Sequence, residues 1–342
     1  MRYYKLILGN DVFDSLKSST PLNINFDIQI FQENASQIVG SISIINPSLE
    51  YYLLAQSYIG KTAELRAGFI KSPLTKKLGY KEGLSDLIFR GLIMNVLGEF
   101  SGIESKITFY FLPFFTNIEK ENFTQENAYS ITLNNGDNLA NKVTSMLSSE
   151  ESIRFLLSKG MQINVLNSAR NLIWRGNSVV LMASTVASFL EKITKLSVKG
   201  DRGENVCMLY RYDNFACLNF YASGSNDLAE DALVLTSEEF ITQPQTVNIV
   251  NGLTCILRLR ADLYVGKIVS IEGVTPQIAG DWTSMQTLTP NYDTTKIFHT
   301  GTYLITSVNH LGEFYNSSES SWTTQIECIP LKFNNLTTRN IL

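Results

Sequence analysis

The sequence is poor in the residues on which most enzymes and metal sites depend. Only two histidines, His299 and His310, occur among 342 residues. The four cysteines lack the close paired spacing of zinc sites and are too few for a disulfide scaffold, so we expect reduced thiols in a protein that folds in a cytoplasm. Since little remains for acid–base or metal chemistry, we predict no catalytic residue, no cofactor site and no metal site.

Charge is scarce as well. Charged residues make up 18% of the chain, below the typical quarter, and the formal net charge is −4. Because this charge provides no basic excess to neutralise phosphates, a nucleic-acid binder is not expected, although DNA could still pass through a lumen. With 44% hydrophobic residues, some surface is expected to be covered by another subunit.

Long hydrophobic runs are absent. The first residues, Met1–Lys5, lead into an alternating pattern rather than an apolar run with a cleavage site, so no secretory signal is expected. The uncharged stretch Gly176–Leu190 is shorter than the ~20 residues that cross a bilayer, and its periodicity is that of an amphipathic helix. No membrane association is predicted.

Within residues 1–115, the dominant pattern from Leu22 to Leu112 is an apolar residue at every second position, which is typical of strands with one buried face. Asn46-Pro47-Ser48 interrupts this pattern, and a turn is expected around Gly98 and Gly102. Several short strands at this spacing predict a first small β-barrel. The clearest runs are Ile24–Ile30, Ile38–Ile44, Ala63–Phe69, Asp86–Leu97 and Ile103–Leu112.

Residues 116–235 change to helical periodicity, with a boundary near 114–120, and predict a mixed α/β middle domain. A helix is expected behind Asp137 as N-cap, a second one after Ser148, and a third from about Ser178 to Lys195. Strand character returns near Val206–Tyr221, and the last strands of this domain could return to the first barrel.

Residues 236–342 again alternate with period two and predict a second β-barrel with a polar C-terminal extension. Leu253–Arg260 is the clearest alternating run, and Trp322–Pro330 is the expected closing strand. Arg258 and Arg260 share one face of the first run, which could point to a subunit interface, to a lumen or to solvent. The predicted fold class is therefore mainly β, with two similar small β-barrels and a mixed helical middle domain.

The two strand regions share landmarks in the same order. Each match alone is weak, because glycine-bearing turns converge easily, but the common order predicts two barrels of one kind. The structural landmarks are Gly60, Lys61, Gly91, Gly98, Gly266, Lys267, Gly301 and Gly312. The matched segments are Tyr58–Lys61 with Tyr264–Lys267, Phe89–Gly91 with His299–Gly301, Leu97–Phe100 with Leu311–Phe314, and Leu112-Pro113 with Ile329-Pro330.

Both ends of the chain resemble baseplate hub proteins of contractile-tailed phages and related injection machines. In that family an alternating strand ends in an Asn-Leu-Ser-like turn, and here Pro47 replaces the usual leucine. A strand that carries valine and histidine precedes a Gly-acidic turn and a Trp-containing last strand. The segments that carry the resemblance are Ile42–Ser48, Gly60–Phe69, Leu87–Gly91, Leu263–Lys267, Gly301–Glu313 and Ser321–Thr324.

The resemblance implies a structural hub rather than an enzyme. It implies a homotrimeric ring that connects the tail tube protein to the central spike protein, contacts baseplate wedge proteins and surrounds a channel in which DNA is only cargo. It also implies a location in the tail baseplate of the virion after assembly in the host cytoplasm. A trimer with two barrels per chain presents six similar units, so threefold symmetry can meet a sixfold partner.

Two other function classes stay open. A tail-associated peptidoglycan hydrolase needs two carboxylates, and Glu150-Glu151 and Glu238-Glu239 are adjacent pairs. Their positions at expected helix starts are explained more simply by the helix dipole. A receptor-binding tail-tip module is the third class. His299 and His310 are interpreted as structural residues.

Overall fold

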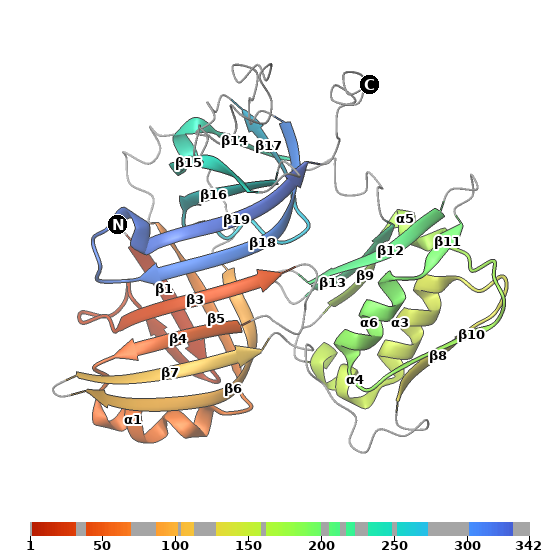
Figure 1. Cartoon of the computed structure of the whole chain (residues 1–342). Helices are drawn as coiled ribbons and strands as arrows, with labels where there is room; N and C mark the ends of the chain where they lie inside the picture. The colour runs from red at the N-terminus through yellow and green to blue at the C-terminus, as the bar shows by residue number, and fades with distance from the viewer. Residues whose placement is uncertain are drawn as a thin grey trace.

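The computed structural model describes residues 2–31, 39–69, 87–101, 104–112, 128–158, 162–199, 205–212, 217–222, 232–247, 252–272 and 301–330. Within these ranges the chain is mainly β, and its longer helices are gathered in a separate middle part (Figure 1). The prediction of a mainly β fold with a mixed helical middle is therefore confirmed. None of the described helices is long and apolar enough to cross a bilayer. His299, the boundary at 114–120 and the C-terminal extension lie outside the described residues.

The first module comprises the strands between residues 2 and 112. Apolar residues at alternate positions are buried along these strands, as the period-two pattern predicted; Ile24 and Ile28, for example, are fully buried. Its strands are β1 (Arg2–Leu8), β2 (Asp11–Asp14), β3 (Asn23–Phe31), β4 (Val39–Ile45), β5 (Thr62–Phe69), β6 (Leu87–Ser101) and β7 (Glu104–Leu112). Between β4 and β5 lie two short helices that the sequence did not predict, α1 (Leu49–Leu54) and the 3₁₀ helix η2 (Ala55–Tyr58).

The second module comprises the strands between residues 233 and 330. The closing strand is confirmed at the predicted residues, Trp322–Pro330. Its elements are β14 (Leu233–Thr236), η3 (Ser237–Glu239), β15 (Phe240–Val247), β16 (Gly252–Arg258), β17 (Ile268–Glu272), β18 (Gly301–Glu313), η5 (Glu319–Ser321) and β19 (Trp322–Pro330).

Apart from β2, which pairs with β1 at the end of the sheet and is left out when the strands of a module are counted, the two modules have the same strand order. The first is arranged β3-β4-β7-β6-β5-β1, and the second is arranged β15-β16-β19-β18-β17-β14. In both, the second and third strands form a hairpin, the third pairs with the last, and the first strand joins the far edge. One pairing differs, because β1 runs antiparallel to β5 whereas β14 runs parallel to β17. The sequence echo therefore reflects a repeated topology.

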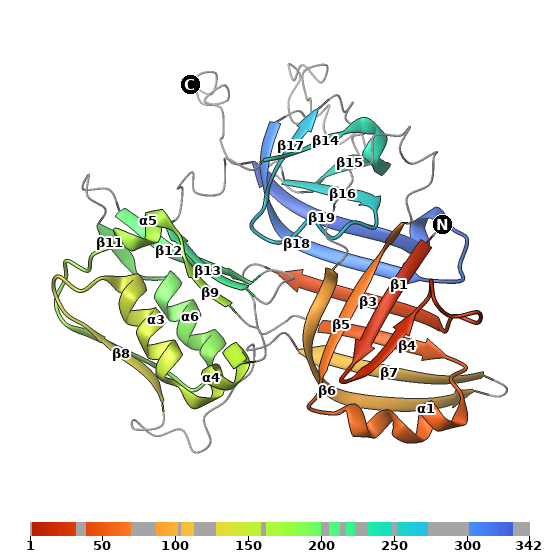
Figure 2. The same cartoon turned by 180° about the vertical axis from the view of Figure 1, so that it is seen from behind.

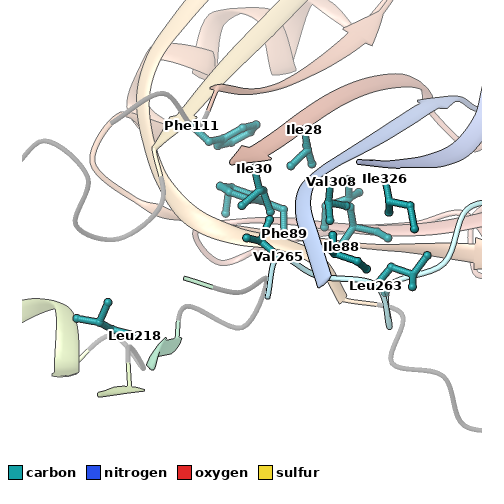
Figure 3. Packing of buried hydrophobic residues seen from close by; sticks show 14 of the residues in the cluster. Ile28, Ile30, Ile88, Phe89, Phe111, Leu218, Leu263, Val265, Val308 and Ile326 are labelled. Atoms are coloured by element: carbon teal, nitrogen blue, oxygen red, sulfur yellow. The ribbon is translucent and has the colours of Figure 1, made fainter. Parts of the chain in front are cut away.

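The modules are not closed barrels but parts of one sheet of 13 strands. They are joined where β18 of the second module pairs with β3 of the first (Figure 1). Seen from behind, β1 and β5 lie at the front of the first module (Figure 2). The core is continuous across the joint, where Ile28 and Ile30 lie beside Val308 and Val265 (Figure 3).

The middle part holds a two-stranded sheet, a four-stranded sheet and the longer helices. Helix α3 buries Leu139, Val143 and Leu147, as its spacing predicted. Its elements are β8 (Tyr129–Leu133), α3 (Leu139–Ser149), α4 (Glu151–Ser158), β9 (Gln162–Val165), α5 (Asn167–Arg170), β10 (Val179–Ala183), α6 (Val186–Thr194), β11 (Ser197–Lys199), β12 (Asn205–Tyr212) and β13 (Cys217–Ala222).

Three local predictions were wrong. The N-cap of α3 is Asn138, whose side chain accepts from Asn141 N–H, whereas Asp137 accepts from Asn134 N–H in the preceding turn. The single helix expected from Ser178 is a strand, β10, followed by α6, because Thr185 and Ser188 form a capping box that starts the helix there. Gly98 lies within strand β6 rather than in a turn.

Candidate assembly surface

Each module carries the same Tyr-x-Gly-Lys turn before its fourth strand. Gly60 has φ +78° and Gly266 has φ +83°, a conformation that side chains disfavour and glycine adopts freely. The glycine N–H donates to Ile93 O in the first module (2.8 Å) and to Ile305 O in the second (2.8 Å). The same two isoleucines donate back to Lys61 O and Lys267 O at 3.0 Å.

The lysines of these turns also behave alike. Lys61 Nζ lies 5.1 Å from the Tyr58 ring centroid, and Lys267 Nζ lies 5.0 Å from the Tyr264 ring centroid. These contacts are cation–π interactions. The landmark residues Gly60, Lys61, Gly266 and Lys267 are thus equivalent in backbone, hydrogen bonding and side-chain placement.

The other four landmark glycines are not brought into equivalent places. Leu92 of β6 pairs with Thr62, and Leu304 of β18 pairs with Ile268, which is the equivalent of Thr62. Leu92 and Leu304 are therefore equivalent positions. This structural alignment of β6 with β18 differs by two residues from the alignment predicted from the sequence. Gly91 corresponds to Tyr303, not to Gly301. In the same register Gly98 corresponds to His310.

A shared β-bulge fixes this register. The pairing of β6 with β7 shifts between Ile93 and Asn95, and the pairing of β18 with β19 shifts between Ile305 and Ser307. Both bulges follow directly on the isoleucine that bonds to the glycine turn. Beyond the bulge, residues 95–101 of β6 correspond to residues 307–313 of β18.

Aromatic side chains pack on two of these glycines, and at Gly312 the neighbouring ring, Phe26, is itself buried. A Cβ at Gly312 would lie 2.1 Å from the Phe26 ring, and one at Gly98 would lie 2.2 Å from the Tyr52 hydroxyl oxygen. Phe26 in turn packs edge-on against Trp322, with ring centroids 5.1 Å apart. Gly312 therefore allows first-module and second-module aromatic residues to meet at the joint.

The joint between the modules is an ordinary antiparallel strand pair, with seven registered positions from Ser307 opposite Phe31 to Glu313 opposite Asn25. Arg2 fastens it from the N-terminal side: its guanidinium donates to Ser318 O at 2.5 Å, to Ser321 Oγ at 2.9 Å and to Asn316 O. The loop between β18 and β19 is thereby tied to the first strand of the chain.

His310 lies in this joint, opposite Ile28 on one side and Thr324 on the other, and is fully buried. Its Nδ1 is 3.0 Å from Thr324 Oγ1. The Thr324 hydroxyl oxygen also accepts from Arg260 N–H at 3.1 Å and lies 3.2 Å from Arg260 O. Burial lowers the pKa of His310 to about 3, against a smaller raising effect of Asp262. Such a ring is a structural element rather than a general base at neutral pH.

Arg260, expected at an interface, in a lumen or in solvent, is instead enclosed within the second module. Its side chain is 12% exposed and forms a two-pronged pair with Asp262 at 2.7 Å and a third bond to Glu239 at 2.6 Å. Burial lowers the pKa of Arg260, but the hydrogen bonds and charges of Asp262 and Glu239 outweigh it, so the pKa is raised overall. Arg260 holds η3 against the strand end.

The acidic pairs considered for hydrolysis have structural positions. Glu239 forms a capping box with Thr236, in which the Thr236 N–H donates to Glu239 Oε2 at 2.8 Å. Glu150 is the C-cap of α3, and Glu151 is in the first turn of α4. Across the described ranges, no group of three or more His, Cys, Asp and Glu side chains could hold a metal ion.

The sheet face opposite the core is polar and spans both modules. Pairing aligns Leu311 with Asp27, Asp27 with Ser41, and Ser41 with Tyr110 across four strands. An open groove on this face is lined by Asn25, Asp27, Ser41, Ser43 and Glu313, among others. Along the neighbouring strands β16, β19, β18, β3, β4, β7 and residues 95–101 of β6, strand alternation places on this face the acidic residues Asp27, Glu99, Glu104, Glu313 and Glu327 and the basic residues Lys106 and Arg258.

One strand edge differs between the modules. One edge of β18 pairs with β19, and the opposite edge pairs first with β17, through residues 301–304, and then with β3, through residues 307–313. The equivalent edge of β6 pairs with β5 only through Leu87–Leu92. Among the strands that the structure describes, none occupies that edge along residues 95–101.

This edge carries exposed apolar side chains. Leu97 is 44% and Phe100 is 69% exposed, whereas Gly312, the equivalent of Phe100, is buried. Helix α1 lies beside β6 in both views (Figures 1 and 2), and the Tyr52 ring packs on the Phe100 ring at 4.7 Å. Leu53 of this helix is 73% exposed. We call residues 95–101 together with α1 the open rim.

No known protein-family profile matches the sequence, and no characterised protein matches it in sequence. Its fold is similar to solved structures. The 43 kDa tail protein of prophage MuSo2 from Shewanella oneidensis has a TM-score of 0.52 at 8% identity, with 97% of each chain covered. The chain thus has the fold of a phage tail protein, as its sequence predicted.

Two further structures are related less closely, each with a TM-score of 0.49. The tail protein from Neisseria meningitidis MC58 is 8% identical, with 96% of each chain covered. The Escherichia coli c3393 protein is 10% identical, with 92% of this chain and 75% of that chain covered. The latter is described as a type VI secretion component structurally similar to the T4 tail proteins gp27 and gp5.

Proposed function

We propose that this chain is a structural subunit of a phage-type tail baseplate, a hub whose three copies form a ring between the tail tube and the central spike. The observation that carries the proposal is the repeated module: two units of one strand order stand edge to edge in a single sheet. Three such chains place six similar units around an axis, which suits a threefold spike on one side and a sixfold tube on the other.

The polar sheet face is the proposed channel lining. It spans both modules without interruption, and it carries more acidic than basic side chains. Since binding to DNA depends on cations that neutralise phosphates, an acidic lining would let DNA pass without holding it. DNA is then cargo, in agreement with the net charge of −4.

The proposed partners are the spike protein, the tube protein and baseplate wedge proteins, with assembly in the host cytoplasm and a final location in the virion tail. No enzymatic activity is proposed, because both carboxylate pairs lie at helix ends and His310 is neutral and enclosed. A cell-wall zymogram is expected to show no clearing band. A band that disappears in Glu150→Gln/Glu151→Gln or Glu238→Gln/Glu239→Gln would favour the hydrolase instead.

Sedimentation velocity at micromolar concentration tests the ring. The expected species has three times the chain mass of 38.4 kDa, and negative-stain views down its axis should show a central hole. A folded monomer at that concentration would contradict the proposal. Binding of the isolated protein to host cells would instead support a receptor-binding tail-tip module.

A further inference from the structure

We infer that Cys255 and Cys328 form a disulfide site that is open while the chain folds in a reducing cytoplasm and is closed by a peroxide outside the cell. The site follows from the geometry of the second module, and only the time of its closure rests on the proposed location in the virion. The disulfide would join β16 to β19, which are neighbouring strands of the sheet.

The two cysteines lie on one face of adjacent antiparallel strands. Cys255 of β16 pairs with Ile326 of β19. Leu253, two positions before Cys255 and therefore on the same face, pairs with Cys328. Both cysteines are buried in the core, with 0% and 2% of their surface exposed. They are therefore diagonal neighbours in the interior of the module.

The two thiols are in direct contact. They are hydrogen-bonded to each other, and Cys328 Sγ also donates to Leu253 O at 3.5 Å. A single buried cysteine is commonly no more than a small apolar side chain. Two thiols that meet from different strands form instead a pair that needs only the loss of two hydrogen atoms to become a covalent link.

Closing the link requires a small approach of the two strands. Diagonal neighbours in an antiparallel pair lie about 7 Å apart between Cα atoms, and disulfides usually span about 6 Å. β16 therefore has to move toward β19 by about 1 Å.

The pairing on the other side of β16 permits this movement. The register of β15 with β16 shifts between Thr242 and Gln245, and this shift lies opposite Cys255. The shifted segment contains Pro244, which has no N–H to donate to β16. Such an irregularity disrupts the ladder locally, and local opening costs least where backbone hydrogen bonds are missing. Cys255 therefore lies where β16 can shift and where a small oxidant can enter.

Hydrogen peroxide is the oxidant that fits a buried site, because it is small. The Cys255 thiolate attacks one peroxide oxygen, the O–O bond breaks, and the sulfur becomes a sulfenic acid while the departing hydroxide takes the thiol proton and leaves as water. The Cys328 sulfur then attacks the sulfenic sulfur, the S–O bond breaks, and the hydroxyl leaves as water with the Cys328 proton. Each sulfur is oxidised by one electron, and both peroxide oxygens are reduced to water.

The link would stabilise the second module. The chain between the two cysteines contains β17 and β18, so the link closes a long loop that includes the strand at the joint of the modules. A cross-link that closes a long loop restricts the unfolded chain and thereby stabilises the fold. The oxidised protein should therefore resist unfolding better than the reduced protein.

Peptide mapping after peroxide treatment tests the site in the unmodified protein. We expect a pair of peptides joined through Cys255 and Cys328 that dithiothreitol separates. In Cys207→Ser/Cys217→Ser, which removes the other two cysteines, alkylation during unfolding should label both remaining thiols before the treatment and neither after it. The midpoint of thermal unfolding should rise by about 5 °C or more on oxidation.

Cys207→Ser/Cys217→Ser/Cys328→Ala is the matched control, because Cys255 then has no partner. Peroxide should add oxygen to its sulfur and should not raise the unfolding midpoint. Labels that persist in Cys207→Ser/Cys217→Ser after peroxide, or a gain of oxygen in place of the loss of two hydrogens, would overturn the inference. So would a linked protein whose unfolding midpoint does not rise. A failed disulfide leaves the ring standing, since sedimentation of the reduced protein tests the ring separately.

Discussion

His310 should make the stability of this protein fall in mild acid. Its pKa in the folded chain is about 3, because burial disfavours the charged ring, whereas a histidine in an unfolded chain titrates near 6.5. Between these values the unfolded chain binds the proton and the folded chain does not. The contribution of His310 is therefore fully present above about pH 6.5 and is lost as the pH falls toward 3.

The size of the effect follows from this difference. At 1.36 kcal/mol per pH unit, lowering the pH from 7 to 4.5 should cost between about 2 and 3 kcal/mol through this residue. Denaturant unfolding of the wild type and of His310→Gln at both pH values measures it. Carboxylates contribute equally to both proteins. The difference between the two proteins in the free energy of unfolding lost from pH 7 to pH 4.5 therefore isolates the contribution of the imidazole.

His299→Gln is the natural control, since it removes the other histidine of the sequence. We expect His310→Gln to be less stable at pH 7, because Thr324 loses its ring partner, but to lose less stability on acidification. An equal loss of unfolding free energy on acidification in the wild type and in His310→Gln would refute the reasoning. So would a change in this loss in His299→Gln alone.

Three further results are expected. Gly312→Ala should destabilise the fold by about 1 to 3 kcal/mol, because its Cβ would meet the Phe26 ring at 2.1 Å, and Phe26→Leu should partly rescue it in denaturant unfolding. Arg260→Met should cost about 3 to 5 kcal/mol, since Asp262 would keep a buried charge without its partner, whereas Arg260→Met/Asp262→Asn should cost less. Cys255 and Cys328 are free and buried, and the hydrogen bond between them together with burial raises the pKa of Cys328. Mass spectrometry after alkylation should find both cysteines unlabelled until the protein is unfolded.

The repeated module connects these expectations. The Gly-Lys turn and the bulge after Ile93 and Ile305 recur although the strands around them share little sequence. Both features set where a long strand bends and changes partners. The end of β18 beyond the bulge is covered by β3, whereas none of the described strands pairs with the equivalent edge of β6.

Much of this could be predicted from the sequence because it depends on local patterns. A strand with one buried face must alternate, so Ile24–Ile30 and Trp322–Pro330 were recognisable. A left-handed turn requires glycine, so Gly60 and Gly266 marked equivalent places. The order of these signals along the chain predicted two related strand modules, and the resemblance to baseplate hub proteins predicted a phage-tail fold.

The rest was decided by tertiary structure, because partners distant in sequence leave no local signal. The match of Gly98 with Gly312 was two residues out of register, since register in β6 and β18 is set by a bulge and by the opposing strand. Helix α1 has six residues and no buried one, too short a segment to show a helical period. The joint of β18 with β3, and the edge that β6 leaves unoccupied among the described strands, follow only from which strands pack side by side.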